Sequence, residues 1–270
     1  MIPSLWSELI YHANSKQRNR DMKRSLRNIK GYKIIGSDGS EGNLNDFLFD
    51  DESWIIRYIE AGFREIERPR ILIPRSSLRI VDWQQKTIEL SFDKGKIESS
   101  PSLDRHATVS REYEKKLIQH YKVDPYWPYT YLPPTDTQMH FPPRPLHIPD
   151  KEVHKADLDS SLRSFREVRG YRIKGTDGKI GQVEDIIVDD EDWQIIYLII
   201  DTSRWLPWSK SIILSINWVK SISFMNSEMY VRLTADQIKH APEFDPSHPI
   251  DMDYEKALHE YYHELKQATS

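Results

Sequence analysis

Short runs of alternating hydrophobic and polar residues follow one another along this 270-residue chain, most clearly in its C-terminal half. The run Tyr171–Lys174 ends at Asp177-Gly178, a dipeptide that supplies the positive φ of a tight hairpin turn. The β-branched and aromatic stretch Trp193–Ile200 predicts a buried strand. Further strands are predicted at 180–188, 212–214, 219–224 and 229–233, with a turn at Asn226-Ser227.

Helical patterns follow these strands. Thr234–Gln237 is a capping box that predicts a short helix ending before Pro242. From Asp253 to Lys266, apolar side chains recur at helical spacing. We therefore predict about six short antiparallel strands followed by helices. Strands of this length, separated by turns, favour a small barrel, because closure removes exposed sheet edges.

The same pattern occurs twice in the chain. Residues 25–58 and 164–197 are identical at 16 of 34 positions when they are aligned at an offset of 139, and the match resumes at an offset of 141 near the C-terminal helix of each copy. Glycine marks backbone positions that need positive φ or close approach, so copied spacing indicates copied backbone geometry. Eight of the ten glycines form two matched quartets: Gly31, Gly36, Gly39, Gly42 and Gly170, Gly175, Gly178, Gly181.

Proline separates the two copies. Eight of the sixteen prolines lie between Pro125 and Pro149, where they favour extended polyproline geometry, and the aromatic residues among them predict an arm that lies against a domain surface. Pro142–Pro145 also fits a ligand for an SH3-type groove, although a stiff spacer is the preferred interpretation. The predicted division is an N-terminal segment 1–24, a first copy with its C-terminal helix 25–122, an arm 123–157, and a second copy with its C-terminal helix 158–270.

The amino-acid composition excludes several classes of functional site. Hydrophobic residues make up only 38% of the chain, but 8 Trp, 14 Tyr and 8 Phe argue against disorder throughout. The absence of cysteine excludes disulfides, a thiol nucleophile and thiolate metal sites. A net charge of −4 argues against nucleic-acid binding as a global property. No apolar run approaches the ~20 residues that span a bilayer, so we expect a soluble, cytoplasmic protein.

Catalytic and metal-binding motifs are weak. The glycine pattern is neither a dinucleotide nor a phosphate loop, and hairpin geometry explains it. The acidic stretches 50–52 and 189–192 lack calcium-loop spacing and predict solvated hairpin tips. His259 and His263 share a helix face, but no metal-protease motif surrounds them, and a metal site there is the weaker alternative. No nucleophile elbow occurs. We predict no enzymatic activity, no catalytic residues, no metal and no cofactor.

Two segments are candidates for binding. Residues 16–30 carry seven basic side chains and one acid, which suits a phosphate or an anionic membrane surface, whereas the alternative is a solvated lead-in to the first strand. The loop Trp205–Ser209 replaces a polar loop in the first copy, and its tryptophans either anchor a partner or pack within the protein. The candidate binding residues are Trp205, Leu206, Trp208, Lys16, Arg18, Arg20, Lys23 and Arg24.

The second copy resembles a known family. The run from Gly170 to Thr202, followed by Trp205-Leu206-Pro207 and by the stretch Thr234–Tyr262, is similar to bacterial tandem PRC-barrel proteins. The resemblance is strong over residues 164–262 and weaker over 25–121. It implies a fold that is mainly β with helices: two small antiparallel β-barrels of PRC type, each followed by helices and joined by the Pro/aromatic-rich arm. The copies are expected to pack about a pseudo-twofold axis.

The resemblance also implies a function. PRC-barrels occur in the cytoplasmic part of the photosynthetic reaction-centre H subunit and in the C-terminal domain of ribosome-maturation factors. It therefore implies a non-catalytic, regulatory protein that docks on a larger assembly, such as the cytoplasmic face of an inner-membrane electron-transfer complex. A ribosome- or RNA-associated adaptor is the first alternative, and a metal protein or enzyme is the second. Protein partners are expected, nucleic acid is disfavoured, and a homo-oligomer is compatible with the sequence.

Overall fold

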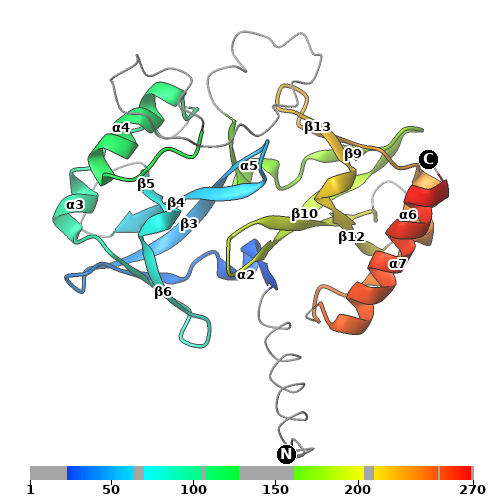
Figure 1. The fold of residues 1–270 in the computed structure, drawn as a ribbon, viewed down its shortest axis with the longest axis horizontal. Helices are drawn as coiled ribbons and strands as arrows, with labels where there is room; N and C mark the ends of the chain where they lie inside the picture. Colours follow the sequence, from blue (N-terminus) through cyan, green and yellow to red (C-terminus); the bar gives the residue numbers. More distant parts are fainter. Residues whose placement is uncertain are drawn as a thin grey trace, which may run out of the picture.

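Two β-sheets lie side by side in the computed structural model, which describes residues 23–63, 70–104, 108–127, 161–203, 210–248 and 250–268 (Figure 1). We call the described residues up to 127 the first half and those from 161 onward the second half. The fold is mainly β with its longer helices at the outside, and one of the sheets curls into a half-barrel. No helix within the described ranges has the length and apolar character needed to cross a membrane.

The halves repeat the same order of elements. The first half contains β1 (Lys23–Ser25), α2 (Leu26–Ile29), β2 (Lys33–Ile35), β3 (Glu41–Asp50), β4 (Ile55–Phe63), β5 (Ile71–Pro74), the 3₁₀ turn η1 (Arg75–Ser77), β6 (Leu78–Asp82), β7 (Thr87–Leu90), α3 (Lys94–Glu98) and α4 (Arg111–Tyr121). The second half contains β8 (Leu162–Ser164), α5 (Phe165–Val168), β9 (Arg172–Lys174), β10 (Lys179–Asp189), β11 (Ile195–Asp201), β12 (Ser211–Ser215), η2 (Ile216–Trp218), β13 (Val219–Ser223), β14 (Glu228–Val231), α6 (Ala235–His240), β15 (Glu243–Phe244) and α7 (Met252–Ala268).

The local predictions are confirmed where they rest on turns and caps. The Asp177-Gly178 turn joins β9 to β10, and the Thr234 capping box opens α6. Gly178 has φ 149°, the conformation that the hairpin prediction required.

The prediction of purely antiparallel strands was wrong at two places. β2 pairs with β7 in parallel, and β9 pairs with β14 in parallel. The sheet brings β2 beside the second strand of the β6–β7 hairpin, and β9 lies in the same way beside the second strand of the β13–β14 hairpin. In each case the two neighbouring strands run in the same direction. Among the described strands the order is β5-β4-β3-β2-β7-β6 in one sheet and β13-β14-β9-β10-β11-β12-β15 in the other, with β8 beside β3 and β1 beside β10 off these paths. Both paths are open, and β6 and β13 each lie at the end of one.

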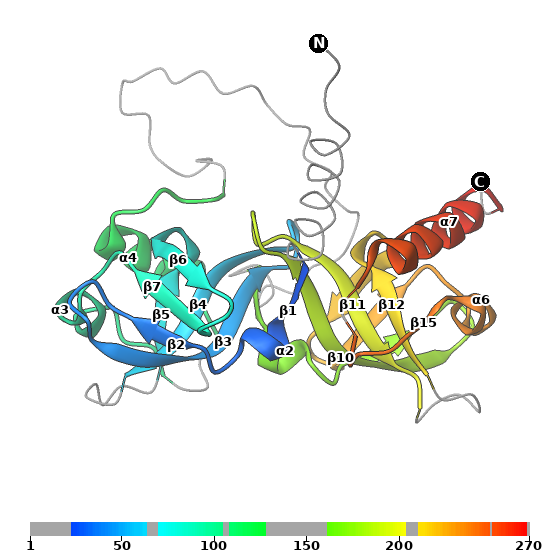
Figure 2. The same ribbon diagram turned by 90° about the horizontal axis from the view of Figure 1, so that it is seen from below.

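Each half lends its leading strand to the other half. β1 pairs with β10 of the second half, and β8 pairs with β3 of the first half, both antiparallel. Figure 2 shows β1 and α2 at the centre of the molecule, between the two sheets. Lys23–Ser25 therefore belongs to the sheet of the second half, and Leu162–Ser164 belongs to the sheet of the first half.

The hairpin tips of the two halves also meet. The backbone N–H of Ile56 donates to the Trp193 carbonyl at 3.0 Å, and the N–H of Ile195 donates to the Trp54 carbonyl at 2.7 Å. One continuous hydrophobic cluster includes residues of both halves, with Phe47, Phe165 and Trp193 in contact at its centre. The two halves therefore share a core.

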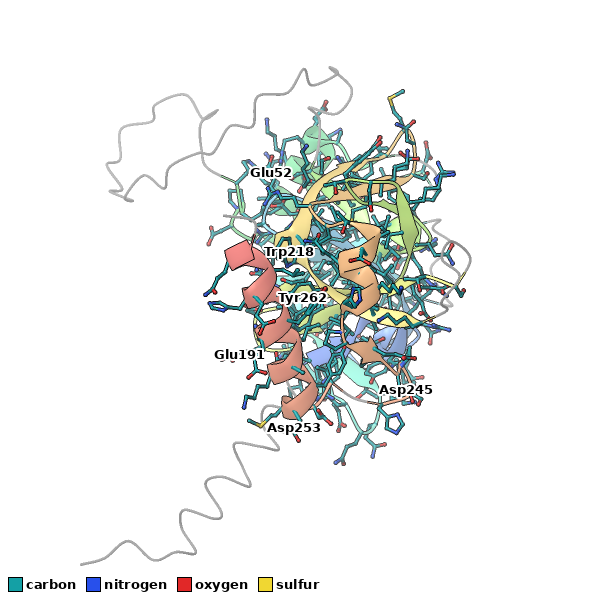
Figure 3. The ribbon with its side chains drawn as sticks, turned by 90° about the vertical axis from the view of Figure 1, so that its right-hand side faces the viewer. Glu52, Glu191, Trp218, Asp245, Asp253 and Tyr262 are labelled. Atoms are coloured by element: carbon teal, nitrogen blue, oxygen red, sulfur yellow. The ribbon has the colours of Figure 1, made fainter. Side chains whose placement is uncertain are left out.

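A helix covers the outside of each half. The Tyr113 hydroxyl of α4 donates to the Pro101 carbonyl at 2.9 Å, and the Tyr254 hydroxyl of α7 donates to the Pro242 carbonyl at 3.1 Å. Figure 3 shows α7 along the second sheet, where the Tyr262 ring lies 5.7 Å from Trp218. The 141-residue offset of these pairs equals the offset found in the sequence.

Candidate functional site

Buried carboxylates hold the exchanged segments in place. Asp46 and Asp185 are 1% and 5% exposed, and each follows a bulge in the central hairpin of its half. The Ser164 hydroxyl donates to Asp46, and the Ser25 hydroxyl donates to Asp185. A bulge re-aims the side chain that follows it, so each carboxylate points at the segment from the other half.

The same serines begin the short helices α2 and α5. Ser25 accepts a hydrogen bond from the Asn28 N–H and Ser164 accepts one from the Glu167 N–H, so each caps a helix while it donates to the buried carboxylate. Burial raises the pKa of both Asp46 and Asp185, and their hydrogen bonds act in the opposite direction. These serines and carboxylates stabilise the junction between the halves.

Ion pairs between the halves surround this centre. Arg24 Nε lies 2.9 Å from Asp190 Oδ2, and Arg163 Nε lies 3.0 Å from Asp51 Oδ2. The prediction that the acidic tips are solvated was wrong for these two residues, because the tips lie against the other half and not in open solvent. Burial raises the pKa of Asp51 to about 6, even though Arg163 lowers it.

Each of these arginines also covers an aromatic ring. The Arg24 guanidinium lies 4.4 Å from the centre of the Trp83 ring, and that of Arg163 lies 3.5 Å from the centre of the Phe224 ring. Such contacts favour a planar guanidinium over an ammonium.

The outer helices carry a second matched pair of acids, of which Glu114 is buried and Glu255 is partly buried. Glu114 of α4 accepts from the Tyr126 hydroxyl at 2.8 Å and pairs with Arg111 at 3.1 Å. Glu255 of α7 accepts from the Tyr197 hydroxyl at 3.0 Å and pairs with Lys23. Burial first, and the neighbouring glutamate second, raise the pKa values of Tyr126 and Tyr197, so both hydroxyls stay protonated and donate.

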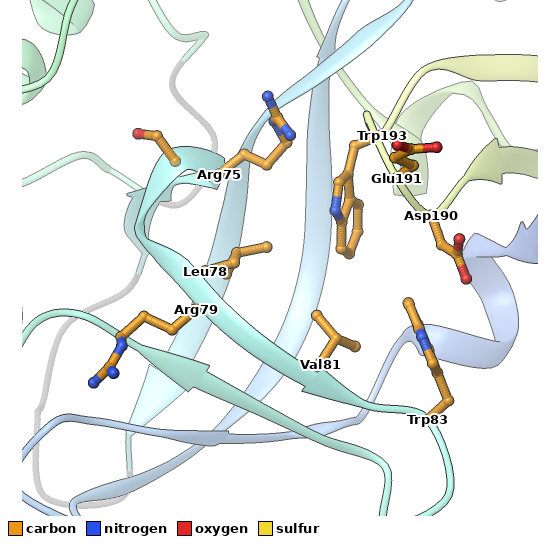
Figure 4. A pocket seen from close by; sticks show the side chains of 9 residues that line it. Arg75, Leu78, Arg79, Val81, Trp83, Asp190, Glu191 and Trp193 are labelled. Carbon is orange, nitrogen blue, oxygen red and sulfur yellow. The ribbon is translucent and has the colours of Figure 1, made fainter. Parts of the chain in front are cut away.

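An open cleft lies beside the junction. Its volume is about 460 Å³, within the range of ligand-binding pockets. One wall comes from η1 and β6 of the first half, and the other wall is the β10–β11 tip of the second half. It is lined by Arg75, Ser76, Leu78, Arg79, Val81, Trp83, Asp190, Glu191 and Trp193 (Figure 4).

Figure 4 shows the arrangement inside the cleft. Leu78 and Val81 point toward Trp193, Arg75 lies at one end, and Trp83 lies beside Asp190 at the other. Trp193 is only 5% exposed and has φ 62°, a left-handed conformation that is uncommon for a bulky residue. Its backbone bonds to β4 and its ring contacts with Phe47 and Trp83 hold it there.

Arg75 differs from the other charged groups of the junction. It is half-buried, and its guanidinium makes no hydrogen bond or ion pair with any residue in the described part of the chain. Burial lowers the pKa of its guanidinium, and the nearby Arg57 lowers it further, whereas Asp192 acts in the opposite direction. An incoming anion would therefore gain a charge-assisted hydrogen bond from a group already partly stripped of water.

The candidate binding residues divide into two groups. Lys23 and Arg24 pair with Glu255 and Asp190 of the second half, so both are engaged within the chain. Their role toward a partner, like that of the other candidates, remains a prediction. Lys16, Arg18, Arg20, Trp205, Leu206 and Trp208 lie outside the described residues, as does the proline motif 142–145.

The later histidines lie apart from the cleft. His259 Nε2 lies 3.3 Å from the Tyr197 hydroxyl and 3.8 Å from Glu255. Across the described ranges, no group of three or more potential metal ligands comes together.

Sequence reasoning missed the cleft. Its two walls are more than 100 residues apart in the chain, and none of its residues belongs to a recognised motif. One signal was present: the 141-residue offset sets Arg75 opposite Ile216 and Ile80 opposite Ser221, so the repeated sequence diverges along this wall.

Comparison with known proteins gives one family. The sequence profile of the PRC-barrel domain matches residues 162–238, which run from β8 into α6. No curated protein matches the chain. The second half therefore contains a PRC-barrel domain.

Proposed function

We propose that this protein is a non-catalytic adaptor in which two PRC-barrel-type units, related by tandem duplication, form one body that docks on a larger assembly. The PRC-barrel match at 162–238 supports the assignment of the second unit. The repeated sequence and the equivalent contacts of Ser25 and Ser164 support extending it to the first unit.

One observation carries the non-catalytic assignment. Four of the enclosed acids form two matched pairs, Asp46 with Asp185 and Glu114 with Glu255. The Ser164 and Ser25 hydroxyls contact the aspartates, and the hydroxyls of Tyr58 and Tyr197, which occupy matching positions, contact the glutamates. A contact that both halves make is required by both halves in order to fold. These are also the groups whose burial would otherwise favour an acid–base role.

Affinity purification of the tagged full-length protein from the cells that make it tests the proposal. We expect a defined assembly to be recovered in a fixed ratio with the chain. Its components would decide between a membrane electron-transfer complex and a ribosomal particle, the two kinds of assembly that the resemblance implies. Recovery of the chain alone, at its natural abundance and at low salt, would refute the adaptor function.

A further inference from the structure

β6 is an edge strand that borders the cleft. It pairs with β7 on one side and ends the strand order of its sheet, so no described strand covers its other side. The cleft runs along it, since lining residues are spread from Leu78 to Trp83. An edge strand presents unpaired backbone N–H and C=O groups, which pair readily with another extended chain.

One exposed side chain of β6 is unusual for a free edge, although the neighbouring Arg79 is exposed and charged. Ile80 is 52% exposed, one of only three large hydrophobic residues in the described part of the chain with such exposure. Folded proteins normally place polar or charged residues on exposed edges to prevent unwanted pairing. β13, the equivalent strand of the second half, follows that practice, because Ser221 occupies the matching position.

The charged residues that line the cleft favour a negatively charged group at Arg75. Arg24 neutralises Asp190, and Arg79 and Glu191 add one charge of each sign to the lining. The Arg75 guanidinium has no hydrogen-bonded or ion-paired partner among the described residues, although Asp192 acts on it at longer range. The matching residue of the second half is Ile216, so this cation is particular to the cleft. Leu78 and Val81 add an apolar floor next to it (Figure 4).

We propose that the cleft binds an extended peptide segment of a partner protein, which pairs with the outer edge of β6, places an acidic side chain at Arg75 and rests an apolar side chain on Leu78 and Val81. Alternate side chains of a strand face the same side, so the recognised pattern is an acidic residue followed by an apolar one two positions later. Backbone pairing supplies affinity and these two contacts supply specificity. This inference rests on the adaptor function and assigns its docking site.

A designed peptide probes the cleft directly. The probe is a fluorescein-labelled Thr-Glu-Thr-Val-Thr-Val-Thr, which carries the acid and two valines on one face. Titration with the full-length protein, followed by fluorescence anisotropy, should give saturable binding below about 0.5 mM, the range of a weak complex. A probe with lysine in place of glutamate should bind at least about tenfold more weakly. A probe N-methylated at alternate residues should not bind, because it cannot pair with the strand.

Three variants locate the binding. Arg75→Ile introduces the residue found at the matching position of the second half and should weaken binding of the glutamate probe at least about fivefold. Ile80→Ser makes the corresponding exchange on β6 and should weaken it as well. Lys220→Ala, on the exposed face of β13, is the matched control and should leave the affinity unchanged. Urea unfolding midpoints establish that each variant is folded.

Amide hydrogen exchange gives an independent readout. The bound glutamate probe should slow exchange along Leu78–Asp82 and leave Val219–Ser223 unaffected. Absence of saturable binding, equal affinity for the N-methylated probe, or an equal loss in Lys220→Ala would overturn the docking site. If the assembly is still recovered by affinity purification in that case, the adaptor function stands and only its location on β6 fails.

Discussion

The two sides of the junction share their inner contacts and differ at their outer walls. Ser25 and Ser164 reach equivalent buried carboxylates, and Trp54 and Trp193 make equivalent backbone bonds. Around them, Arg75 stands opposite Ile216 and Ile80 opposite Ser221. The contacts by which each half holds the other are present twice, whereas the basic Arg75 and the exposed Ile80 of the wall that borders the cleft are present once. This separates the part of the repeat that is needed for folding from the part available for recognition.

The largest expected effect comes from replacing the tryptophan at each hairpin tip, which tests how equivalent the two tips are. Trp193→Ala should lower the free energy of unfolding by about 3–5 kcal/mol, because it empties a position that is almost fully buried between the halves. Trp54→Ala should cost less, since Trp54 is only partly buried. Urea denaturation of both variants measures the difference, and equal losses would show that the two tips are equally buried in solution.

The exchanged segments provide the next test. Ser25→Ala and Ser164→Ala each remove a helix cap and a hydrogen bond to a buried carboxylate, so each should cost about 1–2 kcal/mol. Because the contacts are equivalent, the two losses should agree within about 0.5 kcal/mol, and the double variant should show their sum. A loss in only one variant would mean that the two serine contacts are not equivalent in solution.

The pH dependence of stability tests the environment of Asp51 at the tip of the first half. Asp51 has a raised pKa of about 6 in the folded protein, above that of an unfolded chain, so the folded state takes up the proton first as the pH falls. Its contribution to stability is therefore present at low pH and is lost as the pH rises from about 4 to about 6. Relative to Asp51→Asn, the wild type should gain on the order of 1–2 kcal/mol between pH 7 and pH 4.5.

Urea unfolding of both proteins at the two pH values measures this gain. The comparison cancels contributions from Asp46 and Asp185, which both proteins retain. A wild type that loses stability relative to the variant over this interval would contradict the raised pKa.

The smallest effect concerns half-exposed arginines at the rim. Arg27 pairs with Glu184, and Arg166 pairs with Glu60 and the buried Asp46, while both guanidinium side chains are 51% exposed. Arg27→Ala should cost less than about 0.5 kcal/mol and Arg166→Ala up to about 1 kcal/mol. Thermal unfolding at low and high salt checks the order. A larger cost for Arg27→Ala would mean that burial of the acidic partner does not determine how much each ion pair contributes to the free energy of unfolding.

Local structure was accessible from the sequence. The Asp177-Gly178 turn, the Thr234 cap and the hairpin tips depend on neighbouring residues, and the structure places them as predicted. The strand exchange was not accessible, for a physical reason that lies in the repeat itself. Asp46 and Asp185 occupy matching positions, so Ser25 finds the same chemistry on its own half as on the other. Only the three-dimensional path of the chain determines which of the two carboxylates Ser25 contacts.

The cleft was inaccessible for a different reason. It forms where residues near position 80 meet residues near position 190, and no periodicity in the sequence relates them. The acidic tip was misjudged on the same ground, because a charged tip looks solvated until an arginine from the other half is placed beside it.

The exchange of leading strands also determines when each sheet can receive its exchanged strand during synthesis. β3 ends at residue 50 and its partner β8 begins at residue 162, so 112 residues separate them in synthesis (162 − 50). At about 5–20 residues per second, the first sheet waits on the order of ten seconds for its last strand. β10 meets no such delay, since β1 has already been made when β10 leaves the ribosome. The sheet of the first half is therefore completed only after synthesis has entered the second half.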